Sequence, residues 1–254
     1  MSVLAMVNGL YTSGTAMMLS LRKQEITTNN MANAQTDGFK ISRLVTHDTV
    51  KTGRDVDDYM RQRELQRADE VHVDWSSGPL IQTGNATDVA LRGDGFLAVS
   101  TPDGERYMRT GSLKTTSDGQ LVDPTGSPVL DQAGQTIHLP GTKTTIGADG
   151  QVSSDGKPVA KLKIVDFPKP YTLKQEGGGH WVPFAANPGD PVPAPTPAKD
   201  DTRVESGSLE GPNVNTVAEM IQMIAQFRNY EADSKVLHAV DSTLDHAVNQ
   251  VGRV

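Results

Sequence analysis

Proline is confined to the middle of this chain, and that distribution limits what the two ends can fold into. All 15 prolines lie between Pro79 and Pro212 in a sequence of 254 residues. Because proline removes a backbone donor and clashes with the preceding helical turn, the ends can form long helices and the middle cannot. The sequence therefore predicts the order helix, irregular segment, β-rich middle, helix, which is an α+β fold.

The N-terminal helix is expected over residues 1–35. Its apolar and small residues recur at alternating spacings of four and three, which is the pattern of a coiled-coil-like helix. They are Val3, Val7, Leu10, Gly14, Met17 and Leu21. Such a row is too narrow to bury a helix by itself, so the helix needs a partner.

The C-terminal helix, expected over residues 213–254, supplies that partner. Thr216 and Glu219 have the spacing of a capping box at its start. Its apolar residues form two runs, and polar residues at Glu231 and Ser234 interrupt the spacing between them. The runs are Val217, Met220, Ile224 and Phe227, then Leu237, Val240, Leu244, Ala247 and Val251. We expect the two terminal helices to pair in one coiled-coil-like helical domain.

The middle of the chain, residues 76–212, predicts an antiparallel β-rich domain. Short β-type runs alternate with Asp-Gly turn signals, for example Asp118-Gly119 and Asp155-Gly156. Asp-Gly supplies the positive backbone φ angles that tight hairpins require. The proline-rich stretch 187–198 predicts an extended loop. Residues 36–75 are expected to connect the first helix to this domain, and no structure is assigned to the strongly charged part at 46–74.

Composition argues against several classes of function. The net charge is −7 and aromatic residues make up 5% of the chain, which disfavours binding to nucleic acid. No apolar run approaches the roughly 20 residues of a membrane-spanning helix. His238, Asp241 and Asp245 can share a helix face, but a solvated face explains them, and His180 is expected at the surface. We expect no enzyme, cofactor or metal, because nucleophile and phosphate-binding motifs are absent from the sequence.

Four segments, taken in order, resemble a known family. The run from Asn29 to Lys40, Asn-Asn-Met-Ala-Asn-Ala-Gln-Thr-Asp-Gly-Phe-Lys, is similar to the signature near the N-terminus of flagellar rod and hook proteins. Three later segments resemble that family in the expected order, namely residues 93–113, residues 118–130 and residues 208–235. A chance match in this order at both ends and in the middle is improbable, so the chain is identified as a member of the family.

The resemblance implies a structural subunit of the flagellar basal-body rod. In this family the paired helices line an inner tube, the β-rich domain faces outward, and the rod transmits torque from motor to hook. The implied partners are other rod proteins, copies of the chain itself and the flagellar type III export apparatus, with a final location in the periplasmic rod and no cleaved signal peptide.

The proximal rod is the expected position. A distal-rod or hook subunit is the first alternative, and a β-rich surface binding module with helical arms is an alternative of another class.

The resemblance and the apolar rows together predict an assembly interface on the two ends of the chain. Its predicted residues are Val3, Val7, Leu10, Gly14, Met17, Leu21, Asn29, Asn30, Asn33, Thr36, Gly38, Phe39, Asn213, Val214, Asn215, Val217, Met220, Ile224, Phe227, Arg228, Tyr230, Leu237, Leu244 and Val248.

Overall fold

The chain divides into two compact units in a computed structural model that describes residues 3–46, 69–141, 143–199 and 202–251. Only the backbone is described at residues 3–12, 46, 69, 244 and 246–251. The helical unit consists of Met1–Ala34, Lys40–Trp75 and Val214–Val254, and the β-rich unit consists of Gln35–Phe39 and Ser76–Asn213. The expected α+β class is confirmed, since helices and strands occupy separate parts of the sequence.

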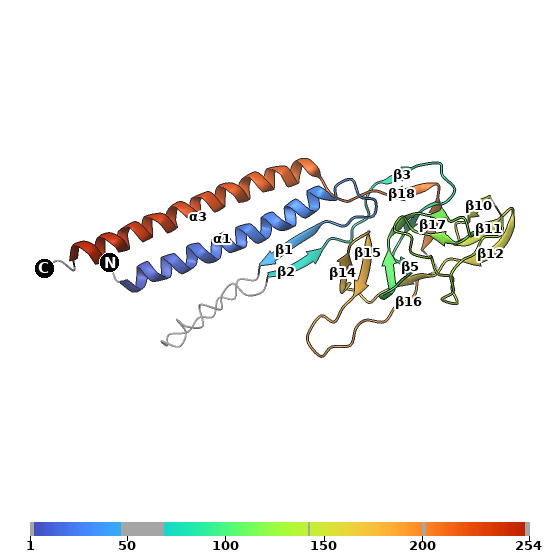
Figure 1. Ribbon diagram of the computed structural model, residues 1–254, viewed down its shortest axis with the longest axis horizontal. Helices are drawn as coiled ribbons and strands as arrows, with labels where there is room; N and C mark the ends of the chain where they lie inside the picture. Colours follow the sequence, from blue (N-terminus) through green and yellow to red (C-terminus); the bar gives the residue numbers. More distant parts are fainter. Residues whose placement is uncertain (1–2, 47–68, 142, 200–201, 252–254) are drawn as a thin grey trace. The chain divides into compact units, whose positions relative to one another are not determined.

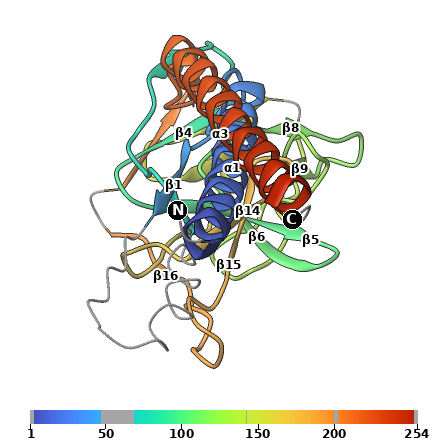
Figure 2. The same cartoon turned by 90° about the vertical axis from the view of Figure 1, so that its left-hand side faces the viewer.

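Two long helices and one strand pair make up the helical unit. Helix α1 (Val3–Ala32) and helix α3 (Thr216–Val251) lie side by side and run in opposite directions (Figures 1 and 2). Strand β1 (Ser42–Thr46) contacts α1 and pairs antiparallel with β2 (Asp69–Val73). Within the described residues, neither helix carries an apolar stretch long enough to cross a bilayer.

The start of α3 differs from the predicted capping box. Asn215 is the N-cap, because its Oδ1 accepts a hydrogen bond of 3.1 Å from the backbone N–H of Ala218. The Glu219 side chain does not cap the helix but is buried, with 3% of its surface exposed. The Thr216-x-x-Glu219 spacing was therefore misleading, since an asparagine one position earlier has the same capping ability and Glu219 has another partner.

The β-rich unit is built from several small antiparallel sheets. The largest has the strand order β14 (Leu173–Glu176), β15 (His180–Pro183), β6 (Gly104–Met108), β5 (Phe96–Thr101), β13 (Ile164–Asp166), β16 (Thr196–Pro197). Two three-stranded sheets have the orders β17 (Arg203–Ser206), β4 (Asp88–Arg92), β7 (Thr110–Ser112) and β10 (Thr144–Ile146), β11 (Gln151–Ser154), β12 (Lys157–Lys161). The remaining pairs are β18 (Ser208–Glu210) with β3 (Leu80–Gln82) and β8 (Lys114–Thr115) with β9 (Leu121–Val122).

The turn between β11 and β12 illustrates why Asp-Gly pairs predicted hairpins. Asp155 and Gly156 both have positive φ angles, 50° and 79°. Such a pair matches the right-handed twist of the strands it joins, and aspartate tolerates this conformation better than most residues. The hairpin follows from these two residues, with Ser154 paired to Lys157 across the turn.

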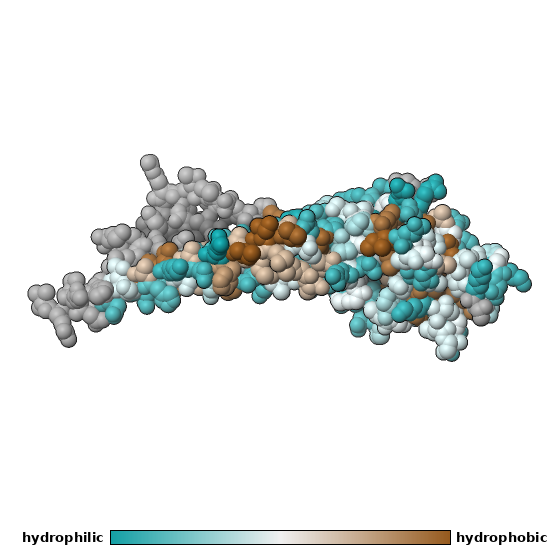
Figure 3. Space-filling view, turned by 90° about the horizontal axis from the view of Figure 1, so that it is seen from above, coloured by the Kyte–Doolittle hydropathy of each residue, from teal (hydrophilic) through white to brown (hydrophobic). Residues whose placement is uncertain are grey.

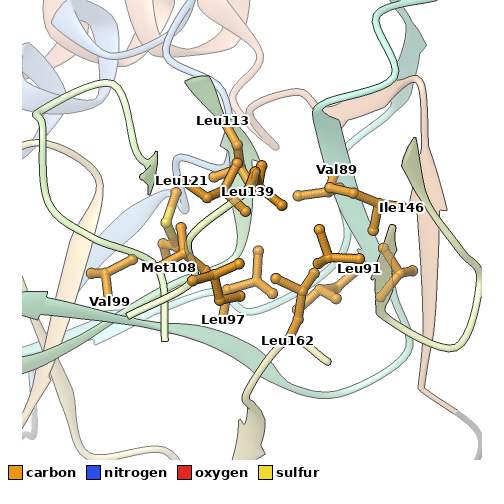
Figure 4. Packing of buried hydrophobic residues seen from close by; sticks show 14 residues of the cluster. Val89, Leu91, Leu97, Val99, Met108, Leu113, Leu121, Leu139, Ile146 and Leu162 are labelled. Atoms are coloured by element: carbon orange, nitrogen blue, oxygen red, sulfur yellow. The ribbon is translucent and has the colours of Figure 1, made fainter. Parts of the chain in front are cut away.

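An aliphatic cluster fills the centre of the β-rich unit. It draws side chains from segments far apart in the sequence, including Val89, Leu97 and Leu162 (Figure 4), and Val204 also belongs to it. These four are at most 2% exposed. Because Val204 lies in β17 and pairs with Leu91 of β4, the late part of the chain contributes to the same core as the early part.

The region that the sequence left unassigned is partly a strand. Asp69–Val73 forms β2, in register with Ser42–Thr46 from Ser42 opposite Val73 to Thr46 opposite Asp69. Residues 47–68 lie outside the described residues. Both strands are short and carry charged residues, so little apolar periodicity marks them in the sequence.

Candidate functional site: the helical assembly surface

The contact between the two helices is polar where the C-terminal end of α1 meets the N-terminal end of α3. Asn30 Nδ2 donates to Glu219 Oε2 at 3.1 Å, and Gln226 Nε2 donates to Thr27 Oγ1 at 3.0 Å. Asn30, Thr27 and Glu219 are each at most 3% exposed. Hydrogen bonds, and not only apolar packing, therefore position the helices here.

Asn30 also holds strand β1 against α1. Its Nδ2 donates to the Ser42 carbonyl at 2.9 Å, and its Oδ1 accepts from the Ser42 N–H at 3.0 Å. One amide side chain of α1 thus forms hydrogen bonds with both β1 and α3. In the sequence this asparagine stands near the expected end of the first helix, where asparagine is common for its backbone preferences.

The face of α3 that carries the first predicted apolar row is open to solvent. Val217, Met220, Ile224 and Phe227 are between 51% and 64% exposed, and Ile221 beside them is 63% exposed. We call these five residues the α3 stripe. Figure 3 shows hydrophobic surface on the helical unit. The expectation that this row faces α1 is wrong, because the row containing Glu219 and Gln226 takes that place through its hydrogen bonds.

The second apolar run of α3 lies on the same side of the helix as Glu219 and Gln226. Tyr230, Leu237 and Val240 are half-buried and continue the spacing from Glu219 through Met223 and Gln226. The interruption expected between the two runs therefore marks a change of face. Arg228 is exposed. Leu244 and Val248 lie within α3, but their side chains are outside the described residues.

The predicted row of α1 is described only in part. Val3, Val7 and Leu10 lie in the helix, and their side chains are outside the described residues. Gly14 and Met17 are half-buried, and a Cβ at Gly14 would meet no atom within 4 Å. Leu21 is 45% exposed and Met18 is 71% exposed, so apolar surface is available on α1 as well.

The motif residues that follow Asn30 divide between the two units. Asn33 donates to the carbonyl of the exposed Asn29 through both its backbone N–H, at 3.1 Å, and its side-chain Nδ2, at 3.0 Å. Thr36 is exposed. Phe39 is buried in the β-rich unit at 1% exposure. Gly38 has φ +70° and a Cβ there would lie 2.6 Å from Thr110 Cγ2, so both backbone and space require glycine.

Residues 213–215, which were also predicted to belong to the assembly interface, come directly before α3. Asn213 Nδ2 donates to the Ser76 carbonyl at 3.1 Å and its backbone N–H donates to the Phe39 carbonyl at 3.4 Å, all within the β-rich unit. Val214 is half-buried, and Asn215 caps α3. The motif here positions two chain segments and begins a helix.

A groove of about 360 Å³ lies within the helical unit, between α1, β1 and the side of α3 that faces them. Lys23 and Asn30 from α1, Arg43 from β1, and Gln226 and Asn229 from α3 contribute to its walls. In the described part of the chain, Gln226 Oε1 is the buried side-chain atom that has no hydrogen-bond partner. If the amide were turned over, Nε2 would take that place, so one polar atom of Gln226 needs a partner in either orientation.

His180 was expected at the surface, and the structure corrects this. It is 7% exposed, and its Nε2 lies 2.5 Å from Asp123 Oδ2. Burial of Asp123 by itself raises the pKa of that carboxyl. Hydrogen bonds from His180, Thr125 and the Ser127 N–H outweigh burial and hold the pKa of Asp123 below its usual range. No sequence signal identified this pair, because the residues are 57 positions apart.

In the residues that the structure describes, no three His, Asp or Glu side chains are grouped to hold a metal ion. What the two units offer is a paired-helix unit with free apolar surface on α3 and a separately packed β-rich unit. Such free apolar surface is typical of a structural protein that contacts other proteins.

Comparison with known proteins agrees with this class. Three family models match: the flagellar basal body rod FlgEFG protein C-terminal region at residues 205–250, the flagellar hook protein FlgE/F/G D1 domain at 90–154, and the flagella basal body rod protein at 10–40.

Whole-length relatives give the same result. The flagellar basal-body rod protein FlgF of Escherichia coli K12 is 34% identical, over 95% of this chain and 97% of its own length. FlgF of Caulobacter vibrioides is 30% identical over 98% and 100% of the two chains, and the flagellar basal-body rod protein FlgG of Bacillus subtilis is 29% identical over 96% and 99%. The chain belongs to the flagellar basal-body rod protein family. As a member it is a structural component of the flagellar basal body and not an enzyme.

Proposed function

We propose that this chain is a subunit of the proximal rod, that it assembles helically through its terminal helices, and that the assembly transmits torque from the motor to the hook. The α3 stripe is the observation that carries this proposal. Five large apolar side chains, each at least half exposed, stand together on one helix of the isolated chain. Apolar surface gathered in this way is typical of a protein contact surface.

The partners in this proposal are copies of the chain and other axial proteins of the flagellum. A contact between the α3 stripe and a different surface of the next subunit builds a filament when the rotation between subunits does not close into a ring. The exposed Met18 and Leu21 of α1 are candidates for the complementary surface. Proximal position is supported by the whole-length similarity to FlgF proteins of several bacteria.

Coiled-coil packing of α1 against α3 belongs to the same proposal. The half-buried Tyr230, Leu237 and Val240 recur at spacings that suit such packing, and they lie beyond the polar contacts at Asn30 and Gln226. Delivery by the flagellar type III export apparatus and a final location in the periplasmic rod rest on family membership.

Thiol labelling tests the assembly surface directly, because the chain has no cysteine of its own. A single cysteine introduced by Ile221→Cys is expected to react with a maleimide in the isolated chain and to be protected in purified basal bodies. The matched control is Val192→Cys, at a position 55% exposed in the proline-rich loop of the β-rich unit. It should react in both states. Equal labelling of Ile221→Cys in the isolated chain and in basal bodies would count against assembly through the α3 stripe.

The alternative reading, a β-rich binding module with helical arms, makes the opposite prediction. It expects deletion of α3 to leave function intact. In the present proposal the same deletion prevents incorporation into basal bodies, which is checked by detecting the chain in purified basal bodies from a strain that lacks its own copy.

A further inference from the structure

Three segments that are distant in the sequence meet inside the β-rich unit at Glu210, which is 1% exposed. The Glu210 carbonyl accepts from the Gly38 N–H at 2.6 Å, and its Oε1 accepts from the Gly78 N–H at 2.9 Å. Its own N–H donates to Thr110 Oγ1 at 3.1 Å. Glu210, late in the chain, is therefore hydrogen-bonded to three earlier segments.

The Glu210 carboxylate also forms an ion pair inside the unit. Arg109 Nε donates to Glu210 Oε2 at 3.1 Å, and the two side chains are 6% and 1% exposed. The rest of the Arg109 guanidinium is held by carbonyl oxygens, that of Gly95 at 2.8 Å and that of Gly93. The guanidinium carbon lies 6.0 Å from the centre of the Phe96 ring. Both charges are thus removed from water and hydrogen-bonded.

A buried ion pair contributes little to stability by itself, but losing one partner is costly because the other charge stays buried without compensation. Arg109 comes between β6 and β7, and Glu210 follows it by 101 residues. A β-rich unit that folded without Glu210 would bury the Arg109 charge against carbonyl oxygens, with no carboxylate from Glu210 to balance it.

The same late segment supplies two further parts of the unit. Strand β17 pairs with β4, and its Val204 belongs to the central aliphatic cluster. Strand β18 pairs with β3, and the Gly211 N–H donates to the Pro79 carbonyl at 2.8 Å. Residues 203–211 therefore supply one strand to each of two sheets, one residue of the core and the carboxylate that balances the Arg109 charge.

We propose that the Arg109–Glu210 pair makes folding of the whole β-rich unit conditional on residues 203–211, so that the preceding strands do not form a stable unit before this segment is in place. The unit is then stable only when the chain as far as Glu210 takes part in it, since the positive charge of Arg109 lies early in the unit and the carboxylate that balances it lies at the end. This inference stands apart from the proposed assembly, because every contact it uses lies within one β-rich unit.

Hydrogen exchange on the full-length chain tests the proposal with Glu210→Gln. This change keeps the shape of the side chain and removes its charge. We expect amides of β4, β5 and β7 to lose protection by about 100-fold or more, together with those of β18, because the unit loses stability as a whole. Loss confined to residues 207–213 would overturn the proposal, since it would show a local contact.

The chain offers a closely matched control. Arg92 and Glu205 also pair at 3.1 Å and also join β4 to the late segment, but their side chains are 73% and 32% exposed. Glu205→Gln should change protection by no more than about threefold, because exposed ion pairs contribute little. An equal effect of Glu205→Gln and Glu210→Gln would contradict a role for charge burial.

A second background keeps the test decisive if Glu210→Gln unfolds the unit. In an Arg109→Met chain there is no guanidinium left to compensate, so adding Glu210→Gln should cost at least about tenfold less protection than it costs in the unmodified chain. If the cost is the same in both backgrounds, the Arg109 charge is not the cause and the proposal fails.

Discussion

Ile224→Asp is the sharpest test of assembly, because Ile224 lies in the middle of the α3 stripe and is 55% exposed. In the isolated chain the new carboxylate stands in water on a helix surface. The substitution should therefore change the free energy of unfolding by no more than about 1 kcal/mol. In an assembled rod the same carboxylate would be buried against apolar surface of a neighbour.

The expected loss of assembly follows from the exposed fractions. Full burial of a large aliphatic or aromatic side chain contributes about 1.5–3 kcal/mol, so covering the exposed half of all five stripe residues contributes about 4–8 kcal/mol. Ile224→Asp removes about 1 kcal/mol of this and adds at least about 2 kcal/mol for an unpaired carboxylate. Together these lower the association constant by about 100-fold or more.

The assay compares incorporation with folding in the same variants. Basal bodies are purified from a strain that carries only the variant chain, and swimming is scored alongside. Val192→Asp is the control, since Val192 is also 55% exposed but lies in the β-rich unit. We expect Ile224→Asp to be absent from basal bodies and Val192→Asp to be present, with both isolated chains folded. Normal incorporation and swimming of Ile224→Asp would refute the reasoning.

Three further predictions concern the isolated chain. Hydrogen exchange should be faster in α1 and α3 than in β4 and β5, because the helices share a partly polar contact while the strands enclose a buried core; protection as strong in the helices as in the strands would contradict this. Asn30→Ala should lower the free energy of unfolding of the helical unit by about 2–3 kcal/mol in urea titration, because it leaves the buried Glu219 carboxylate and half-buried backbone groups of Ser42 without this partner, whereas Asn29→Ala at the exposed neighbouring position should have little effect. The pKa of Asp123 is lowered in the folded chain, so its contribution to stability is present above the usual aspartate pKa and is lost as the pH falls through the folded value; the urea midpoint of the β-rich unit should drop in this acidic range, and Asp123→Asn should weaken that dependence.

Sequence patterns predicted the elements of this fold better than the faces those elements present. Proline distribution located both helices, and Asp-Gly pairs located hairpins such as the one at Asp155-Gly156. Both signals act through the local backbone, so they need no knowledge of distant residues. The weakly alternating β2 was missed, because its pairing with β1 is not evident from either strand alone.

The sequence indicated which residues belong to the candidate site, but not which way each of them faces in the folded chain. Spacing identified the apolar residues of α3 and the motif around Asn30, and the family resemblance connected them to assembly. Spacing could not decide which of two rows on α3 faces α1. That choice depends on Asn30, Glu219 and Gln226, whose hydrogen bonds reach across about 190 residues or more of sequence.

The sequence by itself determined that this protein has two proline-free helical ends around a β-rich middle and that it belongs with flagellar rod proteins. Local backbone preference and ordered motifs are sufficient for both conclusions. Only the tertiary structure decided that Glu219 is buried while Ile224 is exposed, that His180 pairs with Asp123, and that Glu210 compensates Arg109. The physical reason is that burying a polar or charged group depends on a partner, and these partners come together only when the chain is folded.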